Sequence, residues 1–472
     1  MSDKIDVARF CEIEKELSLF SREYCGAPYW QYIRFFVCQY CFTNRFDKGT
    51  EITQERRGLA EVSQKLRKLL SLIKDFFFFC NPGQYDLLIL KNDSLKDKFF
   101  DYWTVPDQIR SVSLRTSLNK DPVSIRERYI LLPLLAFKIR RFARKLKGNT
   151  KDDAEALFLQ ELEERLKNEF GKAPDYKVLI DKIEEDVLMN SCYEDYYRKL
   201  FQRTNVKAIL GVVYYNNDVF AEYKVAKELG VHSVELQHGV INNHHEYYFE
   251  DTSGVNNDTP EYLLTFGELH NKWIRLVEGS SAVAVGFPFQ EYMIRNLESV
   301  ETEDKTIIVY PVSDSRFEHV VSEFADRIVA YGYKVLIKLH PLEADDYQTI
   351  YPVLSGNCNV SFITSQSEGI YYWLKLGTFH VMASTTVGLE AMAFDHTRVC
   401  IAENVPHEQT QCLLDWGLAE GFSTAPELLD IVSNKKTKEK NSEKLLEIRN
   451  GLWKKNAANN ISEFLTGLIE HA

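Results

Sequence analysis

The sequence lacks the segments that would carry a chain into or across a membrane. It has no run of about 18 apolar residues, the length that a spanning helix needs, and "YILLPLLAF" is far too short. Its first residues show no basic, apolar and small-residue pattern of a secretion signal. The nine cysteines are odd in number and scattered, which favours reduced thiols. We therefore expect a cytoplasmic protein.

Several metal, nucleotide and nucleic-acid signatures are missing as well. Cys38 and Cys41 form a CxxC pair, but no second pair completes a zinc site. No phosphate-loop motif and no Gly-x-Gly-x-x-Gly fingerprint occurs, which counts against an NTPase or a dinucleotide oxidoreductase. There is no Asp-x-Asp pair suited to a metal-bound diphosphate. The net charge of -12 argues against nucleic-acid binding, which needs a basic surface.

Two basic amphipathic stretches stand out against this acidic composition. The first is "RRGLAEVSQKLRKLLSLIKDFFFF" (56–79). The second is "KIRRFARKLKG" (138–148), which contains six basic residues and no acidic one. Two interpretations stay open: surface helices with a solvated basic face, or helices that attach to an anionic membrane surface. The second interpretation places the protein at the inner face of the membrane.

The length and pattern of the chain predict two α/β domains. A chain of 472 residues is too long for one ordinary core. Short apolar runs alternate with amphipathic helices, which predicts parallel strands joined by right-handed crossovers in doubly wound sheets. We expect a helical extension (1–80), a first Rossmann-like domain with a helical insertion (81–288), a second such domain (289–440) and C-terminal helices packing back on the first (441–472). Ligands of such domains bind beyond the carboxyl ends of the strands.

The strongest candidate for an anion site is "FHVMASTTVGLEAMAFD" (379–395). A buried strand is expected to end before Ser384, which then becomes the N-cap of a helix with Thr385 and Thr386 in its first turn. Free N–H groups, the helix dipole and three hydroxyls suit a phosphate. Glu390, one turn further along, is placed to accept hydrogen bonds from a diol such as ribose. The alternative is an ordinary Ser/Thr N-cap.

A second candidate lies at the end of the strand predicted in "VLIKLHPLE" (335–343). His340 stands at its carboxyl end, where an imidazole can donate a hydrogen bond to a phosphoryl oxygen, and Pro341 turns the chain outward. Lys338 lies in the same strand and is a further candidate for phosphate binding. The alternative is a histidine bonded to a neighbouring helix end.

A third candidate follows the strand predicted in "VHSVEL". Gln237, His238 and Gly239 come directly after this strand, so we expect His238 to project into a cleft between the domains. An imidazole is suited to take a proton from a hydroxyl near neutral pH.

Two clusters near this candidate are less specific. His244, His245 and Glu246 lie in the loop that follows, and either line a substrate pocket or form a polar connection between the domains. The adjacent histidines lack the i, i+4 spacing of a helical zinc motif, so we expect no metal. The cluster from Tyr214 to Asp218 also follows a predicted strand, but Asp218 is equally well explained as a helix N-cap.

Taken together, these motifs resemble those of bacterial surface-polysaccharide (capsule and lipopolysaccharide) glycosyltransferases of the GT-B architecture. The resemblance is carried by "QHG" (237–239), "TFGELH", "VGFP", "KLHP" and "STTVGLEAMAFD", within about residues 205–405. His-Pro and Ser/Thr motifs are typical of enzymes with cytidine-nucleotide donors, such as sialyltransferases and Kdo transferases. Teichoic-acid glycerophosphotransferases are similar, with Trp-His-Gly at the position of "QHG", and there the histidine is regarded as the base.

The resemblance implies an activity. The chain would transfer a sugar from a nucleotide-activated donor, a CMP-sugar in preference to a UDP-sugar, to a hydroxyl of a surface glycan or a lipid-linked oligosaccharide. It implies no metal and no other cofactor. The alternatives are a nucleotide-sugar 2-epimerase of the same fold, a CDP-glycerol-type phosphotransferase and a non-catalytic assembly partner.

The resemblance also implies roles for individual residues. His238 would be the base, and Glu246 and Asp218 would be further catalytic candidates. In a retaining reaction, a carboxylate such as Asp218 or Glu235 would be the covalent nucleophile. The second domain would bind the donor through Lys338, His340, Pro341, Ser384, Thr385, Thr386 and Glu390, and the first would bind the acceptor through Tyr214, Gln237, Gly239, His244 and His245.

Overall fold

The structure is a computed structural model that describes most of the chain. The residues it describes are 7–42, 59–91, 99–116, 127–147, 152–215, 217–239, 241, 248, 259–365, 367–407, 409–433 and 442–472. The side chains at 7–8, 59–68, 127, 147, 217–218, 342 and 442–445 lie outside this description. Among the predicted site residues, His244, His245, Glu246 and the side chain of Asp218 therefore lie outside the described part.

The first lobe is built on a parallel sheet that has seven strands in the described part of the chain, in the order β5-β4-β3-β6-β7-β8-β9. The chain starts in the middle, runs to one edge and returns to continue to the other, so a switch point lies between β3 and β6. The strands are β3 (Leu87–Lys91), β4 (Ser111–Arg115), β5 (Glu127–Tyr129), β6 (Ala208–Gly211), β7 (His232–Leu236), β8 (Tyr262–Thr265) and β9 (Ser281–Ala284).

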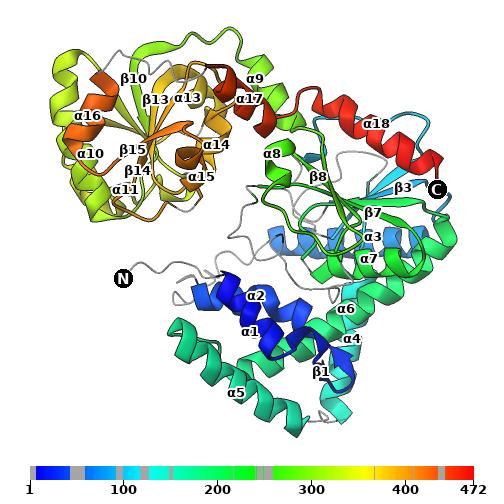
Figure 1. Ribbon diagram of the computed structural model, residues 1–472. Helices are drawn as coiled ribbons and strands as arrows, with labels where there is room; N and C mark the ends of the chain where they lie inside the picture. The colour runs from blue at the N-terminus through cyan, green and yellow to red at the C-terminus, as the bar shows by residue number, and fades with distance from the viewer. Residues whose placement is uncertain are drawn as a thin grey trace.

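The second lobe contains a parallel sheet with the order β12-β11-β10-β13-β14-β15. This order also starts in the middle, and its switch point lies between β10 and β13. The strands are β10 (Glu303–Val309), β11 (Lys334–Lys338), β12 (Val360–Ile363), β13 (Gly377–Met382), β14 (Arg398–Ala402) and β15 (Ala419–Phe422). Two such doubly wound sheets in separate lobes confirm the predicted α/β class and its GT-B architecture (Figure 1).

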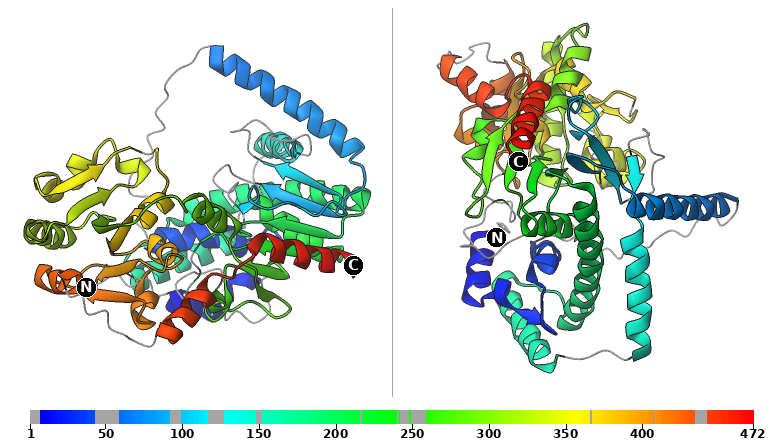
Figure 2. Two further views of the ribbon diagram at one scale, coloured as in Figure 1. Left: turned by 90° about the horizontal axis from the view of Figure 1, so that it is seen from above. Right: turned by 90° about the vertical axis from the view of Figure 1, so that its right-hand side faces the viewer.

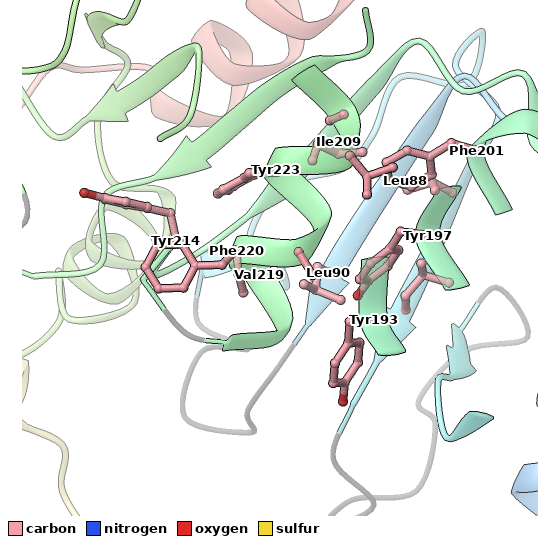
Figure 3. Packing of buried hydrophobic residues seen from close by; sticks show 14 of the residues in the cluster. Leu88, Leu90, Tyr193, Tyr197, Phe201, Ile209, Tyr214, Val219, Phe220 and Tyr223 are labelled. Carbon is pink, nitrogen blue, oxygen red and sulfur yellow. The ribbon is translucent and has the colours of Figure 1, made fainter. Parts of the chain in front are cut away.

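Alternation along the strands gives the first sheet two apolar faces. Leu88 and Ile209 face α6 (Tyr176–Thr204) and α7 (Asn217–Glu228), where they pack with rings such as Tyr197 and Phe220 (Figure 3). The intervening residues Leu87, Leu210 and Val234 face the other way and pack against α18 (Ala457–Glu470). A strand buried on both faces reads as a continuous apolar run, which is why these strands are visible in the sequence.

Helices flank both sheets, and the N-terminal helices gather on the first lobe (Figure 1). Among the described helices, none combines the length and apolar character that crossing a membrane requires. A hairpin of β1 (Glu23–Tyr24) and β2 (Ala27–Pro28) interrupts the N-terminal helices. The N-terminal and inserted helices are α1 (Val7–Glu16), α2 (Trp30–Phe42), α3 (Leu59–Cys80), α4 (Leu132–Lys147) and α5 (Asp153–Phe170). The remaining helices are α8 (Glu268–Asn271), α9 (Pro288–Asn296), α10 (Ser315–Ile328), α11 (Tyr347–Ile350), α12 (Pro352–Ser355), α13 (Ile370–Leu376), α14 (Val387–Ala391), α15 (Gln411–Asp415), α16 (Ala425–Ser433) and α17 (Ser442–Leu452).

The chain crosses between the lobes twice, and the two crossings are in contact. It leaves the first lobe through Gly286 and α9, and it returns between α17 and α18. The backbone N–H of Lys454 donates to the carbonyl of Phe266 at 2.8 Å. Gly286 has a φ of 101°, and a Cβ there would lie 2.2 Å from the carbonyl oxygen of Lys454. Only glycine fits such a close approach at a left-handed position.

Candidate functional site

A cavity of about 540 Å³ lies at the switch point of the second sheet. Its wall is formed mainly by the segments that follow β10, β11 and β13, so it lies beyond the carboxyl ends of these strands. This is the position at which open α/β sheets bind ligands. The polar side chains that line it are Tyr310, Lys338, His340, Glu343, Glu368, Ser384 and Thr385.

The cavity brings together two of the predicted clusters. Lys338, His340 and Pro341 line it from the end of β11, and Ser384 and Thr385 line it from the end of β13. Their convergence follows from the sheet order, because both strands neighbour β10. The other two donor-site candidates, Thr386 and Glu390, are not among the described residues that line the cavity.

The segment after β13 differs from its predicted form. Helix α14 begins only at Val387 and spans five residues, with Thr386 at the N-cap position, so the prediction of Ser384 as N-cap is wrong. The Ser384 hydroxyl instead accepts from the N–H of Gln409 at 3.4 Å, and the Thr385 hydroxyl accepts from the N–H of Val387 at 3.4 Å. These bonds hold the residues in a turn before the helix. A helix of one turn supplies little dipole, so the hydroxyls and the loop carry any anion binding.

Glu390 lies beside the wall of the cavity. Burial, followed by the nearby Glu390 carboxylate, raises the pKa of Tyr310 and Tyr371 far above the usual range. Both phenols are therefore neutral at ordinary pH. The Tyr310 hydroxyl lies 3.2 Å from Nδ1 of His380, a core histidine that the sequence analysis did not single out.

The cavity wall carries charges of both signs. Lys338 is 7 % exposed, its ammonium donates to the carbonyl of Leu339 at 3.0 Å, and burial lowers its pKa. The Glu343 carboxylate accepts from the backbone N–H of His340 at 3.2 Å, and Glu368 is exposed. Cationic groups suit a phosphate, whereas carboxylates suit the hydroxyl or amino groups of a sugar or base. The lining therefore matches a ligand with both kinds of group.

The end of β7 places Gln237 inside the first lobe. This side chain is fully buried. Its oxygen accepts from the N–H of Phe266 at 2.8 Å, and its nitrogen donates to the carbonyl of Gly239 at 2.7 Å and lies 3.1 Å from Nδ1 of His270. Gln237 therefore stabilises the turn that carries His238. Because its side chain is fully buried, it is not exposed to contact an acceptor as predicted.

His238 is half-buried, and its ring contacts Tyr215. The His238 Nε2 atom lies 3.1 Å from the Tyr215 hydroxyl. The predicted acceptor-side residue Tyr214 is instead fully buried in the core of the first lobe. After β6 it is thus Tyr215, the next residue, that reaches His238.

A buried carboxylate fixes the turn that carries these tyrosines. Glu235 accepts from the N–H groups of Val213 at 2.8 Å and Tyr214 at 3.2 Å and from the hydroxyl of Tyr248 at 2.6 Å. Val213 has a φ of 62°, which is strained for a β-branched residue. Because Glu235 is fully buried and holds this turn, it is not placed to serve as a covalent nucleophile. We call Glu235, Tyr215, Tyr248, Gln237 and His238 the His238 cluster.

A chain of contacts runs from the His238 cluster to the second lobe. Burial lowers the pKa of His270 to about 4, so its imidazole is neutral beside Gln237. The His270 ring packs against Trp453, with ring centroids 6.0 Å apart. The indole N–H of Trp453 donates to the carbonyl of Leu389 in α14 at 3.2 Å. Trp453 is a contact that sequence reasoning missed, because its partners are distant in the chain.

A second contact between the lobes involves two indoles. The rings of Trp273 and Trp416 stack with centroids 4.7 Å apart and planes 9° apart. Trp273 follows α8 in the first lobe, and Trp416 follows α15 in the second.

Within the described part of the chain, no group of three or more His, Cys, Asp or Glu side chains is arranged to hold a metal ion.

Comparison with known proteins gives similarity at the level of solved structures. No family model and no curated protein matches the chain. It is similar to the UDP-GlcNAc 2-epimerase of Neisseria meningitidis bound to UDP-GlcNAc (TM-score 0.46, 10 % identity, 82 % of this chain and 100 % of that chain). It is also similar to the UDP-GlcNAc 2-epimerase of Methanocaldococcus jannaschii (0.46, 13 %, 81 % and 99 %) and to the wall teichoic acid polymerase TagF (0.45, 9 %, 88 % and 99 %).

Proposed function

We propose that the chain is a glycosyltransferase that takes a nucleotide-activated sugar in the cavity of the second lobe and an acceptor hydroxyl at His238. The observation that carries the proposal is the cavity at the switch point, with Lys338, His340, Ser384 and Thr385 in its wall. An ammonium, an imidazole and two hydroxyls around one space suit the phosphate of a nucleotide. The resemblance of the His-Pro and Ser/Thr motifs favours a CMP-sugar over a UDP-sugar.

In the proposed reaction the acceptor oxygen attacks the anomeric carbon of the donor sugar. The His238 imidazole takes the proton from the acceptor hydroxyl as the new glycosidic bond forms. The bond between the anomeric carbon and the phosphate oxygen breaks, and its electron pair leaves with the nucleotide. Lys338 and His340 then stabilise the charge that develops on the leaving phosphate. The acceptor in this proposal is a hydroxyl of a surface glycan or of a lipid-linked oligosaccharide.

The binding half of the proposal is tested by a thermal-shift screen of the full chain against CMP, CDP, UDP and GDP. A nucleotide that binds the folded protein stabilises it by about 3 kcal/mol at a hundredfold excess over Kd, which raises Tm by several degrees. The His340→Ala variant should show a smaller shift. The matched control is His319→Ala, an exposed histidine on α10 that does not line the cavity. A screen in which no nucleotide raises Tm would overturn the proposal in favour of a non-catalytic assembly partner.

The transfer half is tested with the sugar donor of the nucleotide that gives the largest shift. Mass spectrometry of an oligosaccharide acceptor should show the addition of one sugar. Two other products would contradict transfer. An isomer formed from UDP-N-acetylglucosamine alone, without acceptor, would identify a 2-epimerase, and glycerophosphate transferred from CDP-glycerol would identify a phosphotransferase.

A further inference from the structure

Exposed large apolar side chains concentrate on two neighbouring helices of the first lobe. Helix α3 projects from the body of the protein, and α4 runs along the same side (Figure 2). The exposed fractions of these side chains range from 40 % to 73 %. They are Leu69, Leu70, Ile73, Phe76 and Phe77 on α3 and Leu135, Ile139, Phe142 and Leu146 on α4. We call this set the α3–α4 apolar stripe.

On α4 the stripe lies opposite the face that packs on the protein. Its residues follow one another at intervals of four, three and four, which places them on one side of the helix. The other side meets α6. There Phe137 is buried, and Arg140 and Arg141 form ion pairs with Asp195 and Glu185 of α6. The stripe therefore points away from the body of the protein.

One face of α3 is held against the protein near the end of the helix. The Asp75 carboxylate accepts from the backbone N–H groups of Leu131 and Leu132 at the start of α4, at 2.6 and 2.7 Å. It also accepts from the hydroxyl of Tyr196 on α6 at 2.8 Å. Asp75 thus ties the three helices together with its own face of α3 inward. Ile73 and Phe77, about half a turn from Asp75 on either side, remain exposed.

The charge beside the stripe has the sign opposite to that of the whole protein. The chain has a net charge of -12, whereas α4 contains no acidic residue. Lys138 and Lys145 are exposed and, at four and three residues from Phe142, lie along one edge of the stripe. Lysine is depleted in the cores of protein–protein interfaces, whereas an apolar stripe bordered by cations is typical of a helix that lies in a lipid interface. The composition of this face favours a bilayer over a protein partner.

We propose that the α3–α4 apolar stripe docks the first lobe on an anionic lipid bilayer. The aliphatic and aromatic side chains enter the boundary between headgroups and acyl chains, while Lys138 and Lys145 meet lipid phosphates. This proposal does not depend on the transfer reaction, and its test does not use it. If the transfer reaction also holds, docking brings the lobe with His238 to an acceptor carried by the membrane.

The test measures flotation of the full chain with phosphatidylcholine vesicles that contain about one third phosphatidylglycerol, compared with pure phosphatidylcholine. The wild type should float with the anionic vesicles, and raised salt should weaken binding because the cations are exposed. Replacing both Ile139 and Phe142 with Ser should reduce binding about tenfold or more, because two exposed apolar anchors are lost. Charge reversal with Lys138→Glu and Lys145→Glu should reduce it by a similar factor.

A matched control is Leu157→Ser on α5, which removes an apolar side chain that is 64 % exposed and lies outside the stripe. This variant should float like the wild type, and all variants should keep the Tm of the wild type, because the changed residues are exposed. Equal flotation of the control and the Ile139/Phe142 variant would overturn the proposal, as would the absence of binding to anionic vesicles. A dimer of the wild type that the Ile139/Phe142 variant abolishes would also overturn it, by assigning the face to a second copy of the chain.

Discussion

The two lobes use the same sheet design but finish their strand ends in opposite ways. In the second lobe the segments after β10, β11 and β13 stand apart and leave a cavity of about 540 Å³. In the first lobe the segments after β6 and β7 are packed together, because Glu235 and Gln237 fill the interior with hydrogen bonds. One region leaves open space beyond its strand ends, whereas the other is closely packed and leaves the His238 imidazole half-buried.

The same sheet design can therefore end in an open cavity or in a packed cluster of hydrogen-bonded side chains. Polar residues at the cavity, such as His340 and Ser384, line open space that a ligand can enter. Polar residues of the His238 cluster mostly face inward and satisfy one another, which limits the motion of the side chain they present. We expect changes in the cavity to alter ligand affinity, and changes in the His238 cluster to alter rate.

The largest expected effect is that of His238→Ala. Removing a general base lowers the rate of transfer about a hundredfold or more, and the nucleotide Kd should stay unchanged because His238 does not line the cavity. Initial rates with the donor found in the nucleotide screen, together with calorimetric Kd values, would separate the two effects. A variant with the wild-type rate would show that the imidazole has no part in the chemistry.

A smaller effect is expected for Glu235→Gln. The substitution keeps the shape of the side chain but removes the charge that accepts from Val213, Tyr214 and Tyr248. Charge-assisted hydrogen bonds are the stronger kind, so we expect a loss of about 1 to 2 kcal/mol in the free energy of unfolding. Urea denaturation measures this loss. Glu161→Gln on the exposed face of α5 is the control, and an equal change in both variants would contradict the role of Glu235.

Each lobe contains a buried neutral histidine, and both should make stability depend on pH. Burial lowers the pKa of His270 to about 4 and that of His380 to about 3, from a value of 6.5 in the unfolded chain. The unfolded chain therefore binds more protons below pH 6.5. Stability is complete above that pH and falls on acidification, by about 1 kcal/mol per pH unit for each histidine.

Urea unfolding at a series of pH values between neutrality and pH 5 measures this slope. His270→Gln should remove the part that comes from the first lobe, and His380→Gln should remove the part that comes from the second. A slope that both variants leave unchanged would mean that these two imidazoles are not the groups that titrate.

The smallest effect is expected where the two regions are joined. Trp453→Phe keeps an aromatic ring but loses the hydrogen bond to Leu389, at a cost of about 1 kcal/mol in stability. Trp103→Phe is the matched control, since its indole also donates to a backbone carbonyl, that of Phe99, but within the first lobe. Both variants should lose similar stability.

Hydrogen exchange would distinguish the two variants. Nucleotide bound in the cavity should slow amide exchange around His238 in the wild type and in Trp103→Phe, and less so in Trp453→Phe. Equal protection in all three proteins would show that the contact through Trp453 does not couple the regions.

Much of this arrangement could be predicted from the sequence, because buried parallel strands are continuous apolar runs bounded by polar turns. The alternation of such runs with helices predicted both sheets. The resemblance implied that His340 and Ser384 bind one donor, and the structure brings both to one cavity because each follows a strand that neighbours β10. Candidate site residues can thus be located from the sequence where a strand has a clear end.

Prediction failed where the chain leaves a strand in an irregular conformation. Val213 takes a left-handed φ in the turn after β6, and Tyr215 rather than the predicted Tyr214 reaches His238. The burial of Gln237 was equally hidden. Its partners Phe266 and His270 lie about 30 residues further along the chain, and a single sequence does not reveal such long-range contacts.

Helix α18, at the end of the described chain, completes the core of the first lobe. Ile461, Leu465 and Ile469 close one face of a sheet whose first strand is β3. The ammonium of Lys207 donates to the carbonyl of Ile469, a residue synthesised 262 positions later. On the ribosome, α18 is therefore synthesised after the whole second lobe. Until α18 packs, one apolar face of the first sheet remains exposed, and chaperones can bind it.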